Sequence, residues 1–104
     1  MRAPAILTVI VSVASAHPSP ALTADTAAGK ELAQRWCAVC HLVAPDQERA
    51  PTVAPPFASI GKKPGFNADQ VAKSMLAPHP QMPGRELSRD QAADIAAYIA
   101  TLAK

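Results

Sequence analysis

The sequence has few aromatic residues, few cysteines and no large excess of charge of one sign. Aromatic side chains make up 4% of its 104 residues, so one domain of this length buries little large apolar surface by itself. Two cysteines allow at most one internal disulfide. The formal net charge of +2 gives no support for nucleic-acid binding, which needs a basic patch or stripe. We therefore expect a disulfide, a metal, a cofactor or a partner to complete the core.

Strand-like alternation of polar and apolar residues is also absent, and no internal repeat is visible. This favours an all-α fold of three main helices joined by long proline-rich loops. The first helix is expected to be capped at its start by Asp25 or Thr26 and to run directly into the cysteines. Apolar residues four or three positions apart mark one face of it: Ala28, Leu32, Trp36 and Val39.

Two later helices carry start signals of the capping-box type. One is expected at about 68–77, opened by Asn67 to Gln70 and stopped before Pro78. The other, at about 89–103, is opened by Ser88 to Gln91. Its apolar face is expected to hold Ile95, Tyr98, Ile99 and Leu102. Residues 44–66 contain five prolines and two glycines and are read as loop, with one short helical turn around Pro56–Ile60.

The N-terminus is typical of a secretory signal peptide. Met1-Arg2 is followed by a ten-residue apolar run, residues 5–14, and by Ala-Ser-Ala ending at Ala16. The run is too short for a stable transmembrane span. Cleavage is expected after Ala16 or Ala24, which makes residues 1–24 a leader with its lead-in and leaves a domain at 25–104. Removing residues 1–16 takes away only Arg2 and lowers the formal charge from +2 to +1.

All thiols of the chain lie in Cys37-Ala38-Val39-Cys40-His41, a C-x-x-C-H motif. Three chemistries use this cysteine spacing. In covalent haem attachment, the thiols add to the haem vinyl groups and the histidine binds the iron. A thiol–disulfide switch is expected beside a βαβ pattern, which is not visible here. A structural zinc site needs four ligands, which these residues and His79 would supply, but adjacent Cys40 and His41 are an awkward pair in one tetrahedral site. Haem is favoured, since a flat apolar ring would complete the weak core.

A haem iron bound by His41 needs a second axial ligand. A methionine thioether suits an electron-transfer iron and raises its potential. Met82 is favoured, because Pro80 and Pro83 stiffen its loop. Met75 lies in the helix expected at 68–77 and is read as a core gap-filler. His79 is a rival ligand that would give a bis-histidine site.

These residues resemble a small monohaem class I c-type cytochrome of the bacterial kind. The resemblance covers roughly residues 26–104 and rests on the C-x-x-C-H motif, on Met82-Pro83 and on the last helix, residues 93–102. It implies the class I cytochrome c fold, in which the first and last helices cross. Gly29 fits the small residue that this crossing needs, with Ile95 and Tyr98 as its partners. Leu32 and Ala33 stand where the family usually has an aromatic residue.

The resemblance also implies roles around the haem. A proline carbonyl after the motif accepts a hydrogen bond from the ligand histidine, and Pro55 matches best, with Pro56 second. Trp36 either packs against the haem or belongs to the core of the first helix. The expected cofactor-binding residues are therefore Cys37, Cys40, His41, Met82, Pro55 and Trp36, with His41 and Met82 on the iron.

The expected function is single-electron transfer by one covalent haem c in the periplasm. A six-coordinate iron cannot bind substrate without losing a ligand, so a carrier is expected and not an enzyme. The partners would be a dehydrogenase donor and an oxidase or reductase acceptor, with no nucleic acid, and the protein would be a monomer or a small-complex subunit. Alternatives are a tightly bound electron-accepting subunit of a periplasmic dehydrogenase, a haem sensor with a labile distal methionine, and a haem-free dithiol or metal protein.

Overall fold

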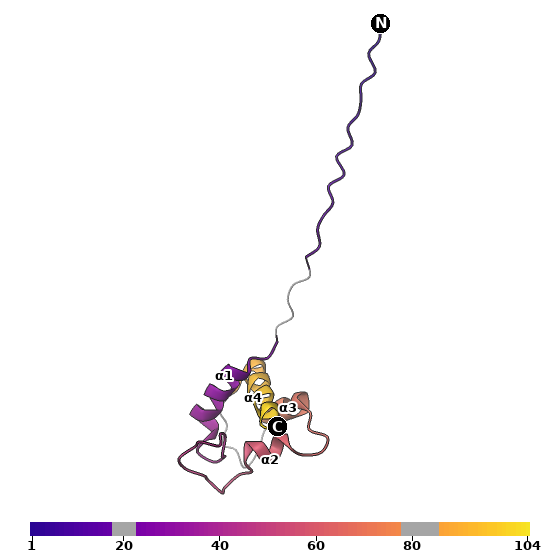
Figure 1. Ribbon diagram of the computed structural model, residues 1–104. Coiled ribbons are helices and arrows are strands. Elements are labelled where there is room, and N and C mark those ends of the chain that lie inside the picture. Colours follow the sequence, from indigo (N-terminus) through magenta and orange to yellow (C-terminus); the bar gives the residue numbers. More distant parts are fainter. Residues whose placement is uncertain (18–22, 78–85) are drawn as a thin grey trace.

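The computed structural model describes residues 1–17, 23–77 and 86–104, and these residues form helices and irregular segments without a strand (Figure 1). Five helical elements follow one another: α1 (Thr26–Leu32), the π-helical turn η1 (Ala33–Cys37), α2 (Phe57–Gly61), α3 (Ala68–Leu76) and α4 (Arg89–Thr101). The all-α prediction is confirmed. The expected helix bounds agree with those of α2, α3 and α4 to within two residues.

Side-chain caps fix where these helices begin. Asp25 accepts a hydrogen bond from the Ala28 amide and caps α1. Ser88 and Gln91 form the complete reciprocal box at the start of α4. At α3 only half of the expected box is present, because Asn67 accepts from the Gln70 amide without a return bond.

The α1 and α4 helices cross in direct backbone contact at Gly29. A β-carbon added there would lie 2.0 Å from the Asp94 carbonyl oxygen and 2.9 Å from the Ile95 amide nitrogen. Only glycine leaves room for this approach. The expected crossing at Gly29 is therefore present with Ile95 as a partner, but its nearest contact is the Asp94 backbone rather than Tyr98. The Asp94 carboxylate also accepts a hydrogen bond from the Asp25 amide at 2.7 Å.

A second glycine, Gly61, brings α2 against the other end of α4. A β-carbon at Gly61 would lie 2.6 Å from the Ile99 carbonyl oxygen. The last helix therefore contacts α1, α2 and α3, and Figure 1 shows it at the centre of the helical part. The buried core around it is small, and its members are Ala33, Val43, Ala44, Phe57, Ile95, Tyr98 and Ile99.

One sequence expectation about the first helix is wrong. Val39 was placed on its apolar face with Leu32 and Trp36, but Val39 is 79% exposed. The helix changes to π-helical hydrogen bonding at Ala33, and the Ala38 amide closes this turn by donating to the Ala33 carbonyl. The chain then turns, so a regular 3.6-residue period does not extend to Val39. Gly29 and Ala33 are the buried residues of this segment.

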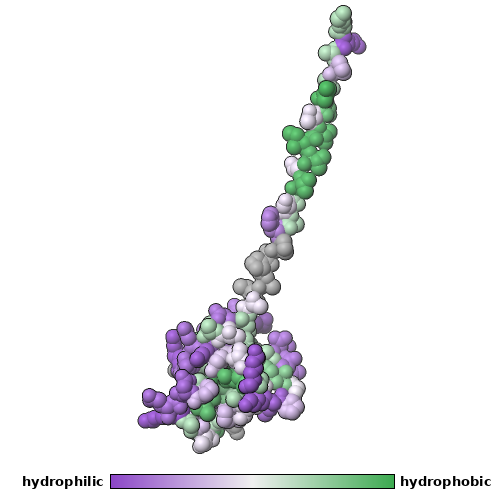
Figure 2. Space-filling model, in the orientation of Figure 1, coloured by the Kyte–Doolittle hydropathy of each residue, from purple (hydrophilic) through white to green (hydrophobic). Residues whose placement is uncertain are grey.

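Residues 1–17 contain no helix, and their large apolar side chains are exposed (Figure 2). Among the described residues, no helix is both long and apolar enough to cross a membrane. The apolar run is visible in Figure 2 as the green stretch of the N-terminal segment, apart from the helical part.

Candidate functional site

Both cysteines and His41 lie where η1 ends and the following loop begins. Cys37 is the last residue of η1, and the amides of Cys40 and His41 both donate to its carbonyl, at 3.2 and 2.9 Å. The motif therefore forms a tight turn. Both cysteines are free thiols and half-buried. We call residues 37–57 the attachment loop.

The His41 imidazole is oriented by a backbone carbonyl on the far side of this loop. Its Nδ1 lies 2.6 Å from the Pro55 carbonyl oxygen. A carbonyl only accepts, so Nδ1 carries the proton, and Nε2 keeps its lone pair for a metal. The ring also packs against Phe57, with centroids 5.1 Å apart and planes tilted by 56°. The hydrogen bond that the sequence assigned to Pro55, ahead of Pro56, is thus present.

Two backbone hydrogen bonds join the two ends of the attachment loop. The Ala54 amide donates to the Cys40 carbonyl at 3.1 Å, and the Phe57 amide donates to the Leu42 carbonyl at 2.9 Å. Phe57 itself is 3% exposed and belongs to the core. The Pro55 carbonyl therefore faces His41 because the residues on either side of it are tied to the motif.

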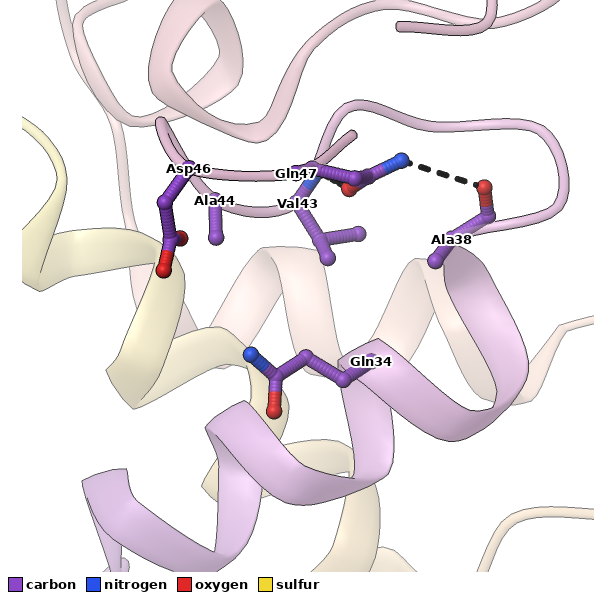
Figure 3. Close-up of a pocket in the computed structure, with 6 residues that line it drawn as sticks. All are labelled: Gln34, Ala38, Val43, Ala44, Asp46 and Gln47. Atoms are coloured by element: carbon purple, nitrogen blue, oxygen red, sulfur yellow. Dashed lines mark hydrogen bonds between the residues drawn. The ribbon is translucent and has the colours of Figure 1, made fainter. Parts of the chain in front are cut away.

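Gln47 is a residue that the sequence reasoning missed. Its Oε1 accepts from the Val43 amide at 2.8 Å, and its Nε2 donates toward the carbonyls of Ala38, His41 and Arg49. It lines an open pocket together with other residues of η1 and the loop (Figure 3). A glutamine in a loop belongs to no motif, so no signal in the sequence could have pointed to it.

The rivals to haem chemistry find little support in this geometry. A thiol–disulfide switch needs a cysteine whose pKa is lowered, whereas burial raises the pKa of the Cys37 thiol. No cluster of three His, Cys, Asp or Glu side chains capable of holding a metal ion occurs in the described part of the chain. The zinc alternative also needed His79, which lies outside the described residues.

Of the other residues expected near the haem, the structure describes Met75 and Trp36 but neither Met82 nor His79. Met82 and His79 both lie outside the described residues. Met75 is half-buried and packs against the core, which agrees with its interpretation as a gap-filler. Trp36 is half-buried in η1, immediately before Cys37.

Comparison with known proteins identifies the chain's family. The family model "Cytochrome c" matches residues 26–103. A cytochrome c-552 from Bradyrhizobium diazoefficiens is 48% identical over 93 residues, which span 89% of this chain and 88% of that protein. No solved structure gave a significant match. The chain belongs to the cytochrome c family.

This cytochrome is a small, bacterial class I c-type protein, as the resemblance implied. Membership brings one covalently bound haem c with its iron, and the protein is a haem-based electron carrier that acts with redox partners. The residues present fit a haem c. They are two free thiols at haem-attachment spacing and an adjacent imidazole whose Nδ1–H already donates a hydrogen bond to the Pro55 carbonyl. Cytochromes c of this kind are generally not enzymes.

Proposed function

We propose that this cytochrome is an exported single-electron carrier with one haem c attached through Cys37 and Cys40, and with His41 and Met82 as the axial ligands of the iron. When bound, the haem iron supplies the one-electron redox chemistry. The observation that carries the His41 assignment is the 2.6 Å hydrogen bond from Nδ1 to the Pro55 carbonyl. It orients the ring and strengthens the donor character of Nε2.

The distal ligand is proposed from the sequence and from the place of its rivals. Met82 is preferred over His79 because the flanking Pro80 and Pro83 stiffen its loop. The packing of Met75 against the core supports the same choice, since a methionine engaged there serves as filler. His41 and Met82 together would leave no coordination position of the iron open to a substrate, which suits a carrier of single electrons.

The proteins that exchange electrons with it follow from this role. We assign a dehydrogenase as donor and an oxidase or reductase as acceptor, with the protein as a monomer or as a subunit of a small complex. Trp36, which is half-buried beside Cys37, is proposed to contact the haem. A Trp36→Phe variant with an unchanged haem spectrum and unchanged stability would contradict that contact.

Export is proposed from the leader. Residues 1–24 comprise a signal peptide and lead-in, and residues 25–104 form the cytochrome domain, which would reside in the periplasm. The exposed apolar run within residues 1–17 suits a segment that is removed rather than one that packs in the fold. The intact mass of the protein from a periplasmic extract decides between cleavage after Ala16 and after Ala24, and a full-length mass would contradict export with processing.

The experiment that tests the proposal is visible spectroscopy of the exported protein. In a host with haem-attachment machinery, we expect a sharp reduced spectrum and a weak methionine-to-iron charge-transfer band in the oxidised state. Met82→Ala should abolish that band, while the control Met75→Ala should keep it. A parent that carries haem but lacks this band would favour His79 as the ligand or an open iron, and ready carbon monoxide binding by the reduced parent would favour a sensor. A colourless protein would overturn the assignment.

A further inference from the structure

The side-chain amide of Gln47 contacts the backbone of two residues of the haem-attachment motif, Ala38 and His41. Its Nε2 lies 3.3 Å from the Ala38 carbonyl oxygen, 3.2 Å from that of His41 and 2.7 Å from that of Arg49. Its Oε1 accepts from the Val43 amide at 2.8 Å. The bond to Ala38 is drawn in Figure 3, where the side chain reaches across from the loop to the end of η1.

We propose that Gln47 is a positioning residue of the haem site, which fixes the backbone of residues 38–41 and through it the orientation of the His41 imidazole. The inference rests on the proposed function in taking His41 as the iron ligand. Two N–H groups are shared among three carbonyls, so the single amide closes the turn that contains Val39 and Cys40.

Within residues 1–17, 23–77 and 86–104, the His41 carbonyl accepts a hydrogen bond from Gln47 alone. The His41 amide donates to the Cys37 carbonyl at 2.9 Å. The neighbouring carbonyls of Cys40 and Leu42 are bound to the other end of the loop by the amides of Ala54 and Phe57. If Gln47 is removed, the peptide that follows His41 can rotate, and the ring then moves relative to the Pro55 carbonyl.

The surroundings of Gln47 favour a specific role over general packing. Its side chain is half-buried and borders an open pocket of about 200 Å³, whereas its bonding partner Val43 is 1% exposed. Water can fill the place of the amide at the pocket but cannot reproduce its fixed fork of donors. Gln34 lies on the opposite wall of the pocket, is exposed, and makes no hydrogen bond with its side chain in the described part of the chain, which makes it a matched control (Figure 3).

The test compares Gln47→Met with Gln34→Met in the haem-loaded protein by redox titration. A weaker bond to Nδ1 lowers the donor strength of the imidazole, which favours ferrous iron. At the midpoint potential of the parent, we expect the ferrous-to-ferric ratio of Gln47→Met to rise about threefold, the order expected when one hydrogen bond is weakened. The His41 Nδ1 proton should also exchange faster with solvent. Gln34→Met should match the parent in both measurements.

Every outcome bears on the proposal. Unchanged potential and unchanged proton exchange in Gln47→Met would overturn it, as would equal shifts in both variants. If Gln47→Met accumulates at the parental level without haem while Gln34→Met is loaded, the positioning role is supported. If Gln47→Met and the smaller polar variant Gln47→Ser are both degraded, the residue serves folding and the proposal is wrong. A parent that lacks covalent haem or His41 ligation would instead refute the proposed function.

Discussion

The α1/α4 crossing and the attachment loop are neighbouring parts of one small molecule, but different interactions hold them. At the crossing, two backbones touch at Gly29, and the contact residues around it, such as Ala33 and Ile95, are fully buried. The attachment loop is tied by individual hydrogen bonds, and both cysteines and His41 are only half-buried. The crossing therefore depends on steric fit within the protein, whereas the loop leaves its thiols and its imidazole partly accessible.

This difference explains how the protein forms a buried core with so few aromatic residues. The helices α1, α2 and α3 all pack against α4, where glycines let backbones approach closely and bury area without large side chains. In the attachment loop, in contrast, hydrogen bonds orient the backbone and the His41 ring. The largest effects on stability should consequently come from the crossing, and the largest effects on the iron from the loop.

Gly29→Ala should break the crossing and cause the largest loss of stability. The added β-carbon would meet the Asp94 carbonyl oxygen at 2.0 Å, so the helices must separate. We expect a loss of about 3 kcal/mol or more in the free energy of unfolding. The higher helix propensity of alanine offsets only about 1 kcal/mol of the cost of this clash. Denaturant unfolding of the haem-loaded protein measures it.

Gly65→Ala is the control for that measurement. Gly65 has a φ of +76° and no atom within 4 Å of an added β-carbon, so its cost is conformational alone. We expect about 1 kcal/mol. If the two substitutions had equal effects, steric fit at the crossing would not be the dominant force.

Gly61→Ala tests whether the contact between α2 and α4 tolerates an added β-carbon as poorly as the α1/α4 crossing does. The added atom would lie 2.6 Å from the Ile99 carbonyl oxygen, a milder clash than at Gly29, and α2 has only five residues that can shift. We expect a loss of about 2 kcal/mol. A loss exceeding that of Gly29→Ala, measured in the same denaturant series, would reverse the ranking of the two contacts.

Tyr98→Phe should weaken the connection between α4 and the attachment loop. The Tyr98 hydroxyl on α4 donates to the Val43 carbonyl in the attachment loop at 2.6 Å, and Tyr98 is 6% exposed. Losing the donor leaves a buried carbonyl without its partner, at a cost of about 1–2 kcal/mol. Thermal unfolding at neutral pH should show the loss with little change in the haem spectrum.

The same tyrosine predicts how stability depends on alkaline pH. Burial, and secondarily the negative charge of Asp46, raises the pKa of Tyr98 above its ordinary value near 10. The folded state then binds more protons than the unfolded state above pH 10, so this contribution is complete below that pH and is lost as pH rises through the folded pKa. Tyr98→Phe should lack this part of the alkaline loss, and identical pH profiles would contradict the assignment.

The sequence predicted those features that follow from periodicity or from a motif. Start signals located α3 and α4, the C-x-x-C-H spacing located the haem chemistry, and the family resemblance led to Gly29 and Pro55. Each of these rests on a local pattern with a known structural meaning. The Met82 loop lies outside the described residues, so that assignment stays a prediction.

What the sequence did not predict depends on contacts between distant segments or on irregular backbone. The exposure of Val39 follows from a π-helical turn, which interrupts the period on which its placement relied. Gly61 lies in a proline-rich segment where nothing indicates that a helix will cross. Gln47 and the bond from Tyr98 to Val43 become visible only when the loop is folded.

Pro55→Ala should have the smallest effect of these changes and sharpens the description of the loop. Pro55 acts on His41 through its carbonyl, which alanine also has. The following Pro56 keeps the preceding residue extended whatever its side chain, so the carbonyl should keep its direction. We expect a loss of about 0.5 kcal/mol, mainly through the greater freedom of the unfolded chain, and an unchanged potential of the iron. If Pro55→Ala shifted the potential as far as Gln47→Met, the proline ring itself, rather than the fixed carbonyl, would orient the imidazole.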